Sequence, residues 1–171
     1  GTVDNARNYE LYYDYYEFPP ETYDVEWPAR GDPSLANRVL ELLRMNGLDC
    51  AVETQRGLDH GVFIPLKLAV PDADIPVVQL SLVSNLNPAM HYAIGEALQP
   101  LREMNVLIVG SGQATHNTRA GMITPPRPDY LDPKTETFID WLRHVVTDTD
   151  LDPEQRKRLL VEWEQQAPNA R

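Results

Sequence analysis

The sequence predicts an α/β fold, in which strands alternate with helices and pair mostly in parallel. Two observations predict it. Runs of β-branched and other apolar residues, typical of buried strands, occur at 75–83 and 106–109, with a shorter and weaker run at 51–53. Four segments with apolar residues at helical spacing lie around these strands. The 171 residues fit one domain, 1–171, and 42% of them are hydrophobic, which is enough for a core.

The chain opens with an arm, residues 1–31, which we expect to be ordered but irregular. It holds six of the eight tyrosines, and prolines interrupt it at Pro19, Pro20 and Pro28. Tyrosine side chains combine a large apolar ring with a polar tip, so we expect most of them to pack onto the surface of the domain. The alternative is that one of them lines a substrate site.

Each predicted helix begins at an aspartate or asparagine followed by proline. The first residue caps the free N–H groups of the opening turn, and proline suits the first helical position. Gly47 is expected to end the first helix, and Pro100 to kink the second near its end. The four starts are Asp32-Pro33, Asn87-Pro88, Asp132-Pro133 and Asp152-Pro153.

Candidate chemistry follows the predicted strand at 106–109. A tight Gly110-Ser111-Gly112 turn ends this strand, and His116 and Asn117 come shortly after it. Ligands of open α/β sheets bind at the carboxyl ends of the strands. His116 is therefore a candidate catalytic residue, and the alternative is a histidine that makes a structural hydrogen bond in a loop.

A second histidine, His60, lies in a similar glycine-flanked context, between Asp59 and Gly61. Histidine is the usual proton carrier near neutral pH, so His60 is the second catalytic candidate. We expect His60 and His116 to converge on one crevice at the carboxyl ends of the strands.

The two other histidines are weaker candidates. His91 lies at the edge of the apolar stripe of its helix, which favours a hydrogen-bonded and partly buried side chain, with a substrate-facing role as the alternative. His144 lies opposite the apolar face of its helix, so we expect solvent around it.

Composition excludes several classes of protein. The formal net charge of −11 argues against binding to nucleic acid or to an anionic membrane. Cys50 is the single cysteine, which rules out a disulfide framework within one chain and fits a reducing compartment such as the cytoplasm. The glycine spacing around Ser111 matches neither a nucleophile elbow nor a phosphate-binding loop.

Short motifs occur along most of the chain in a fixed order. Residues 16–23 read Y-E-F-P-P-E-T-Y, and the further motifs are 27–31, Asp59-His60-Gly61 with Pro65-Leu66, 71–81, 91–95, and 110–117. In this order and spacing they resemble the class III extradiol ring-cleavage dioxygenases, in the branch that includes the L-DOPA 4,5-dioxygenases, whose Y-G-F-P-P-E-x-Y motif has glycine where this chain has Glu17.

The resemblance implies a three-layer αβα fold with a mostly parallel or mixed central sheet around a mononuclear non-haem Fe(II), or Zn²⁺ in the protein as purified. It implies cleavage of a catechol such as L-DOPA by O₂. His116 matches the histidine that relays protons beside the metal, and is a possible metal ligand. His60 matches a histidine that contacts substrate, and Asp59, Asn117 and His91 are the remaining substrate-binding candidates.

Two family motifs that carry metal histidines, H-G-x-P and S-x-H-W, do not occur in the chain, and neither does the family's H-P-x-x-x-H-x-x-P-L segment. We therefore expect the middle part of such an enzyme, with a sheet incomplete at both ends and without a full set of iron ligands. The remaining ligands would come from the rest of the polypeptide or from another copy in a homo-oligomer. The alternative is an inactive relative or a binding module that lacks the metal.

Overall fold

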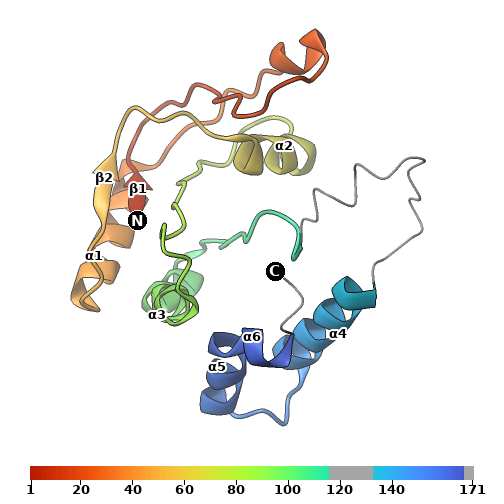
Figure 1. Cartoon of the computed structure of the whole chain (residues 1–171). Helices are drawn as coiled ribbons and strands as arrows, with labels where there is room; N and C mark the ends of the chain where they lie inside the picture. The colour runs from red at the N-terminus through yellow and green to blue at the C-terminus, as the bar shows by residue number, and fades with distance from the viewer. Residues whose placement is uncertain (116–132, 168–171) are drawn as a thin grey trace. The chain divides into compact units, whose positions relative to one another are not determined.

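The structure, a computed structural model, describes residues 1–115 and 133–167. They fall into two compact units, Gly1–Ser111 and Gly112–Arg171. The first unit holds a small parallel sheet with helices, and the described part of the second unit is helical (Figure 1). Within the described residues, no helix is long and apolar enough to cross a membrane.

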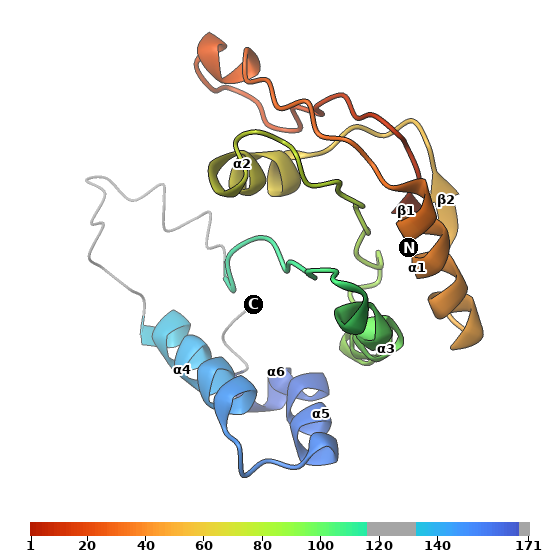
Figure 2. The same cartoon turned by 180° about the vertical axis from the view of Figure 1, so that it is seen from behind.

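The sheet of the first unit has β1 (Thr2–Asp4) and β2 (Ala51–Glu53) as parallel partners, with Val3 opposite Val52. The predicted strand at 51–53 is therefore confirmed, and its partner lies in the arm that we expected to be irregular. Helix α1 (Pro33–Met45) lies within the connection between the two strands, as a parallel pairing requires. It packs beside β1 and β2 in both views of the molecule (Figures 1 and 2).

The predicted strand at 75–83 is wrong, because this segment makes only isolated bridges. Leu80 pairs antiparallel with Val3, and Val77 pairs parallel with Gly31. The segment changes partner between these two residues, and Pro76 supplies no backbone N–H, so no continuous ladder forms. The segment still covers the free edge of β1, where the Ser81 N–H donates to the Thr2 carbonyl (3.0 Å).

The predicted strand at 106–109 is also wrong, since it pairs with no strand within the described residues. From their strand-like composition we also expected 75–83 and 105–110 to be parallel neighbours in one sheet, and this pairing is absent from the described residues. Leu107 is 85% exposed and Val109 is 54% exposed. A β-branched sequence becomes a strand only where another strand offers backbone partners and a surface to pack against.

The helix starts marked by proline are confirmed where the structure describes them. The Asp32 carboxylate caps α1 by accepting the Leu35 N–H (2.9 Å). At the other end, Gly47 takes a left-handed φ of +71°, which lets the Leu48 N–H reach the Leu43 carbonyl (3.0 Å). The predicted glycine stop of this helix is thus confirmed.

Helix α3 (Pro88–Leu98) begins at its predicted cap, where the Asn87 side chain accepts the Met90 N–H (3.0 Å). It continues into the 3-10 helix η2 (Gln99–Met104), which contains Pro100. The kink predicted at Pro100 is therefore a change from α-helix to 3-10 helix. Helices α1 and α3 pack against each other, and the core between them is made by Val3, Ala36, Val39, Leu40, Leu42, Leu43, Ala97, Leu98 and Leu101.

A second core joins the arm to α2 (His60–Ala69). Trp27 is buried and its indole N–H donates to the Val70 carbonyl (2.9 Å), which fixes the arm against the end of α2. The arm also contains the short 3-10 helix η1 (Pro20–Tyr23). The buried members of this core are Tyr9, Trp27, Ala29, Leu58, Phe63 and Ala73.

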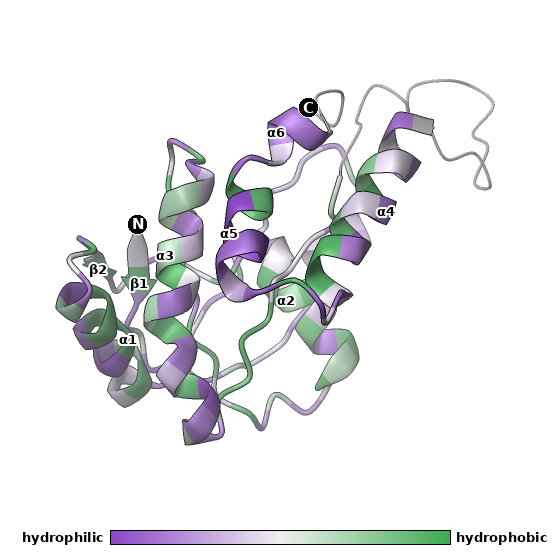
Figure 3. Ribbon diagram, turned by 90° about the horizontal axis from the view of Figure 1, so that it is seen from below, coloured by the Kyte–Doolittle hydropathy of each residue, from purple (hydrophilic) through white to green (hydrophobic). Residues whose placement is uncertain are grey.

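The second unit contains α4 (Pro133–Thr147), α5 (Pro153–Val161) and the short α6 (Trp163–Gln166). The predicted start of α5 is confirmed as a capping box, in which the Asp152 carboxylate accepts the Gln155 N–H (2.8 Å) and the Gln155 side chain accepts the Asp152 N–H (3.2 Å). Both α4 and α5 carry hydrophobic and hydrophilic bands (Figure 3). Aromatic rings of Phe138, Trp141 and Trp163 pack together inside this unit.

Candidate active site

His60 is the first residue of α2, and Asp59 occupies the N-cap position. The turn that we expected around His60 is therefore the start of a helix. Helix α2 was not predicted, because Gly61 and Pro65 are poor helix formers and because nearly all residues of the helix are apolar, which leaves no helical periodicity to detect.

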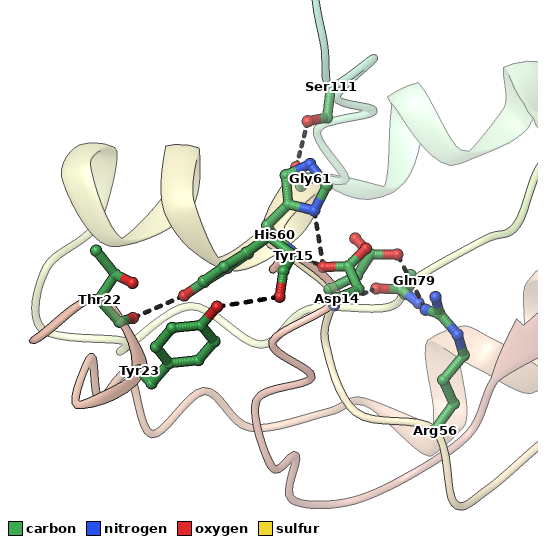
Figure 4. Close-up of polar contacts among 10 residues, drawn as sticks. Asp14, Tyr15, Thr22, Tyr23, Arg56, His60, Gly61, Gln79 and Ser111 are labelled. Atoms are coloured by element: carbon green, nitrogen blue, oxygen red, sulfur yellow. Dashed lines mark hydrogen bonds and ion pairs between the residues drawn. The ribbon is translucent and has the colours of Figure 1, made fainter. Parts of the chain in front are cut away.

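The side chain of Asp14 holds His60 at two points (Figure 4). Its Oδ1 accepts the backbone N–H of His60 (2.9 Å) and lies 2.7 Å from Nδ1 of the imidazole ring. Burial alone would raise the pKa of Asp14, but the hydrogen bonds from the backbone and ring of His60 outweigh it, so the pKa of this carboxyl is lowered. Sequence reasoning missed Asp14, which lies in the arm, 46 residues from His60.

An ionised carboxylate can only accept hydrogen bonds, so Nδ1 of His60 carries the proton in the contact with Asp14. The other ring nitrogen, Nε2, makes no hydrogen bond to the residues that the structure describes. The His60 side chain is 57% exposed, whereas that of Asp14 is 22% exposed. The pair thus presents a supported imidazole to the surface of the unit, a suitable arrangement for accepting or donating a proton.

Aromatic residues of the arm surround this pair. The Tyr15 ring meets the His60 ring edge to face at 6.1 Å, and the Tyr13 ring meets Phe63 of α2 at 5.7 Å. The Tyr15 hydroxyl donates to the Thr22 carbonyl (2.7 Å; Figure 4), so it is used within the arm. Most arm tyrosines pack as expected, although Tyr16 is 80% exposed.

Asp59 is engaged beside His60. Its Oδ2 lies 3.0 Å from the guanidinium of Arg56, and its N–H donates to the Gln79 side chain (3.4 Å). The Arg56 guanidinium also stacks over the Tyr12 ring at 5.2 Å. A surface depression of about 510 Å³ lies next to Arg56 and Tyr12, but His60 does not line it.

The Gly110-Ser111-Gly112 turn is connected to α2. The Ser111 hydroxyl donates a hydrogen bond to the carbonyl of Gly61 (Figure 4). In a regular helix this carbonyl would bind the N–H four residues later, at position 65, but Pro65 has none. Ser111 therefore satisfies the carbonyl that the proline leaves free, and this contact joins residue 111 to the start of α2.

The remaining predicted histidines differ in how they are held. His91 uses both ring nitrogens, because Nδ1 lies 2.8 Å from the Asn87 carbonyl and Nε2 accepts the Val83 N–H (3.1 Å). His144 is 66% exposed on α4, as expected, with Nε2 3.6 Å from the Asp148 carboxylate. His116 and Asn117 lie outside the described residues, so their predicted convergence with His60 stays a prediction.

Within residues 1–115 and 133–167, no group of three or more histidine, cysteine, aspartate or glutamate side chains could hold a metal ion. His60 offers one nitrogen, and the Asp14 carboxylate is already bound to it. This part of the chain therefore does not fit an iron site of two histidines and a carboxylate.

Comparisons with known proteins give a consistent result. Residues 2–163 match the family model described as the catalytic LigB subunit of aromatic ring-opening dioxygenase. A "Dioxygenase tasH" of Hapsidospora irregularis is 50% identical over 123 residues, covering 71% of this chain and 38% of the relative. A "4,5-DOPA dioxygenase extradiol" of Beta vulgaris is 40% identical, covering 92% of this chain and 56% of the relative. The protein of the same name in Mirabilis jalapa is 34% identical, covering 95% and 60%.

Among solved structures, an uncharacterized protein of Escherichia coli K12 superimposes with a TM-score of 0.75 and 27% sequence identity, covering 99% of this chain and 62% of that one. The chain thus spans about half the length of the curated relatives it matches.

Proposed function

Because this chain belongs to the family of catalytic LigB subunits of aromatic ring-opening dioxygenases, we propose that the whole protein is an extradiol dioxygenase that opens the ring of a catechol such as L-DOPA. The family match over residues 2–163 is the observation that carries this proposal. Both atoms of O₂ enter the product, and the ring bond beside the two hydroxyl groups breaks.

The Asp14–His60 pair supplies acid–base chemistry that this reaction needs. A catechol loses hydroxyl protons before its ring opens, and the ring-opening steps need a positioned acid and base. His60, with Nδ1 held by Asp14, presents Nε2 to the catechol. We assign to His60 substrate contact and proton transfer, and to His116 the second proton relay or a metal ligand, with Asn117 beside it at the substrate.

Asp59 and His91 are the other substrate-binding candidates. Substrate contact by Asp59 would require it to exchange its ion pair with Arg56. His91 would have to release a backbone partner at Val83 or Asn87. Their present contacts favour a role in holding the site together.

The same family membership supports a proposal for the cofactor and for the layering of the complete sheet. We propose Fe(II) as the metal of the whole protein and an αβα layering of its complete sheet. A cytoplasmic location is proposed from the single cysteine, Cys50. The described residues do not form the metal site, so the roles assigned to His60, Asp59 and His91 are limited to binding and proton transfer.

The test uses the whole protein with Fe(II), O₂ and L-DOPA. We expect a coloured ring-opened semialdehyde, one O₂ consumed per catechol, and both atoms of labelled ¹⁸O₂ in the product. His116→Ala should lower the rate by about 10²- to 10⁴-fold, the usual contribution of general acid–base catalysis, and His60→Ala should raise the apparent substrate constant as well as slow turnover.

His144→Ala, on the exposed face of α4, is the control and should change little. Catechol binding without O₂ consumption would favour the inactive relative or binding module and overturn the proposal. Equal activities of the His60→Ala and His144→Ala variants would overturn the role of His60.

A further inference from the structure

We propose that Asp14 is a positioning residue that keeps the proton of His60 on Nδ1, so that Nε2 is the nitrogen that meets the substrate. This inference deepens the proposed function and rests on it. None of the family motifs that matched the sequence assigns a role to Asp14.

The geometry shows how one carboxylate can orient the ring. A single oxygen, Oδ1 of Asp14, binds both the backbone N–H and the ring Nδ1 of His60, at 2.9 and 2.7 Å. The backbone contact fixes the carboxylate relative to the main chain at the start of α2, and the ring contact then fixes the side chain. Partners of this kind set the tautomer and the orientation of functional histidines.

The side chains of Asp14 and His60 differ in how far they are exposed to solvent. The side chain of Asp14 is 22% exposed, while that of His60 is 57% exposed. The neighbouring residue in the arm, Tyr15, packs its ring edge to face against the imidazole. Residues 14 and 15 therefore support the imidazole through its Nδ1 and one flank, and Nε2 makes no hydrogen bond to any residue that the structure describes.

The other two described histidines lack this arrangement. Both ring nitrogens of His91 are bound to the backbone. The ring of His144 is not anchored in this way, because its Nε2 lies 3.6 Å from the Asp148 carboxylate, beyond a normal hydrogen bond. Among these three, His60 alone combines one anchored nitrogen with one available nitrogen.

The first test measures the tautomer directly and needs no activity. ¹⁵N NMR of the histidine rings in the whole protein, above the pH at which they titrate, should show His60 with Nδ1 protonated and Nε2 unprotonated. Asp14→Ala should move His60 towards the Nε2-protonated form that an unsupported imidazole prefers, whereas His91 should keep its signals as an internal reference. Protonation of Nε2 in the unaltered protein would overturn the inference.

The second test separates orientation from charge. Asp14→Asn keeps an oxygen acceptor for Nδ1, so the tautomer should remain and kcat should fall less than in Asp14→Ala. For Asp14→Ala we expect a loss in kcat of about 10- to 100-fold with a smaller change in KM. Asp148→Ala, which removes the carboxylate beside His144, is the matched control and should leave kcat unchanged.

The outcomes distinguish this inference from the proposed function. An unchanged tautomer and unchanged kcat in Asp14→Ala would overturn the role of Asp14. The expected tautomers in a protein that consumes no O₂ with catechols would support the coupling of Asp14 to His60 and overturn the proposed function. If Asp14→Ala does not fold, the spectra of the unaltered protein and of Asp14→Asn decide, because both retain the acceptor and both must show Nδ1 protonated.

Discussion

The hydrogen bond from Ser111 to the Gly61 carbonyl predicts an energetic coupling between Ser111 and Pro65. Pro65 lacks the N–H that would normally bind this carbonyl, and the Ser111 hydroxyl takes its place. Ser111→Ala should leave the carbonyl without its protein partner. Pro65→Ala should restore the N–H inside α2, so the hydroxyl would no longer be needed.

The size of the effect follows from how far water can reach the carbonyl. A fully buried group left without a partner costs about 1–3 kcal/mol. Gly61 is only partly buried and Ser111 is exposed, so water replaces part of the lost bond. We therefore expect Ser111→Ala to lower the free energy of unfolding by about 1 kcal/mol, and by almost nothing in the Pro65→Ala background. The coupling in the double-mutant cycle should be about 1 kcal/mol.

Urea unfolding of the four variants measures this coupling. Trp27 lies in the first unit and reports on it by fluorescence once the tryptophans of the second unit have been replaced by phenylalanine. Ser84→Ala, at an exposed serine, is the control and should change little. If Ser111→Ala costs the same in both backgrounds, within about 0.3 kcal/mol, the Ser111 hydroxyl does not stand in for the N–H that Pro65 lacks, and the reasoning is refuted.

Four further predictions concern charge, backbone space and exposed apolar surface, the first two of them charge. The pKa of Asp14 is lowered, so its ionised form stabilises the fold above the pKa of the unfolded chain, and this stabilisation is lost as the pH falls through the pKa of Asp14 in the folded protein; in urea titrations Asp14→Asn should therefore lower the free energy of unfolding at neutral pH and have little effect in acid. Burial raises the pKa of Asp4, which gives the opposite sign: Asp4→Asn should stabilise at neutral pH and have no effect below the pKa of the unfolded chain, and a loss of stability at neutral pH would contradict this. Gly31→Ala should lower the melting temperature through a cost of about 1–3 kcal/mol, because its Cβ would lie 1.9 Å from a backbone carbonyl oxygen, while Gly95→Ala, with open space around it, should not. Leu107 is 85% exposed, so Leu107→Lys should change the free energy of unfolding by no more than about 0.5 kcal/mol. It should also reduce self-association of the protein in sedimentation, and unchanged association would show that Leu107 does not lie in a contact between two copies.

The helix starts were predictable because their signals are local. An Asx residue followed by proline, as at Asp32 and Asp152, caps a helix with atoms that lie within three residues of each other. The helix α2 was not predictable in the same way, since Pro65 argues against a helix interior and is accommodated only through a distant serine.

The strands and the site depended on distant partners. The residues 106–109 have strand-like composition, but composition cannot supply a neighbouring strand. The sequence identified His60 as a candidate through its local motif. It could not identify Asp14, because the contact between them joins positions 46 residues apart and depends on how the arm folds over α2.

The place of β1 in the sheet has a consequence for folding during synthesis. Val3 is fully buried, and β1 lies between partners that are translated much later, β2 at 51–53 and the segment around Leu80. These pairings have high contact order, so the first strand emerges from the ribosome long before the backbone groups that complete it. Until residue 101 has been released, Val3 and the apolar face of α1 lack their final cover, and the nascent chain exposes surface of the kind that chaperones bind. Slower translation between α1 and α3 would therefore prolong the aggregation-prone interval, whereas the helices of the second unit, built from neighbouring segments, can form as soon as they emerge.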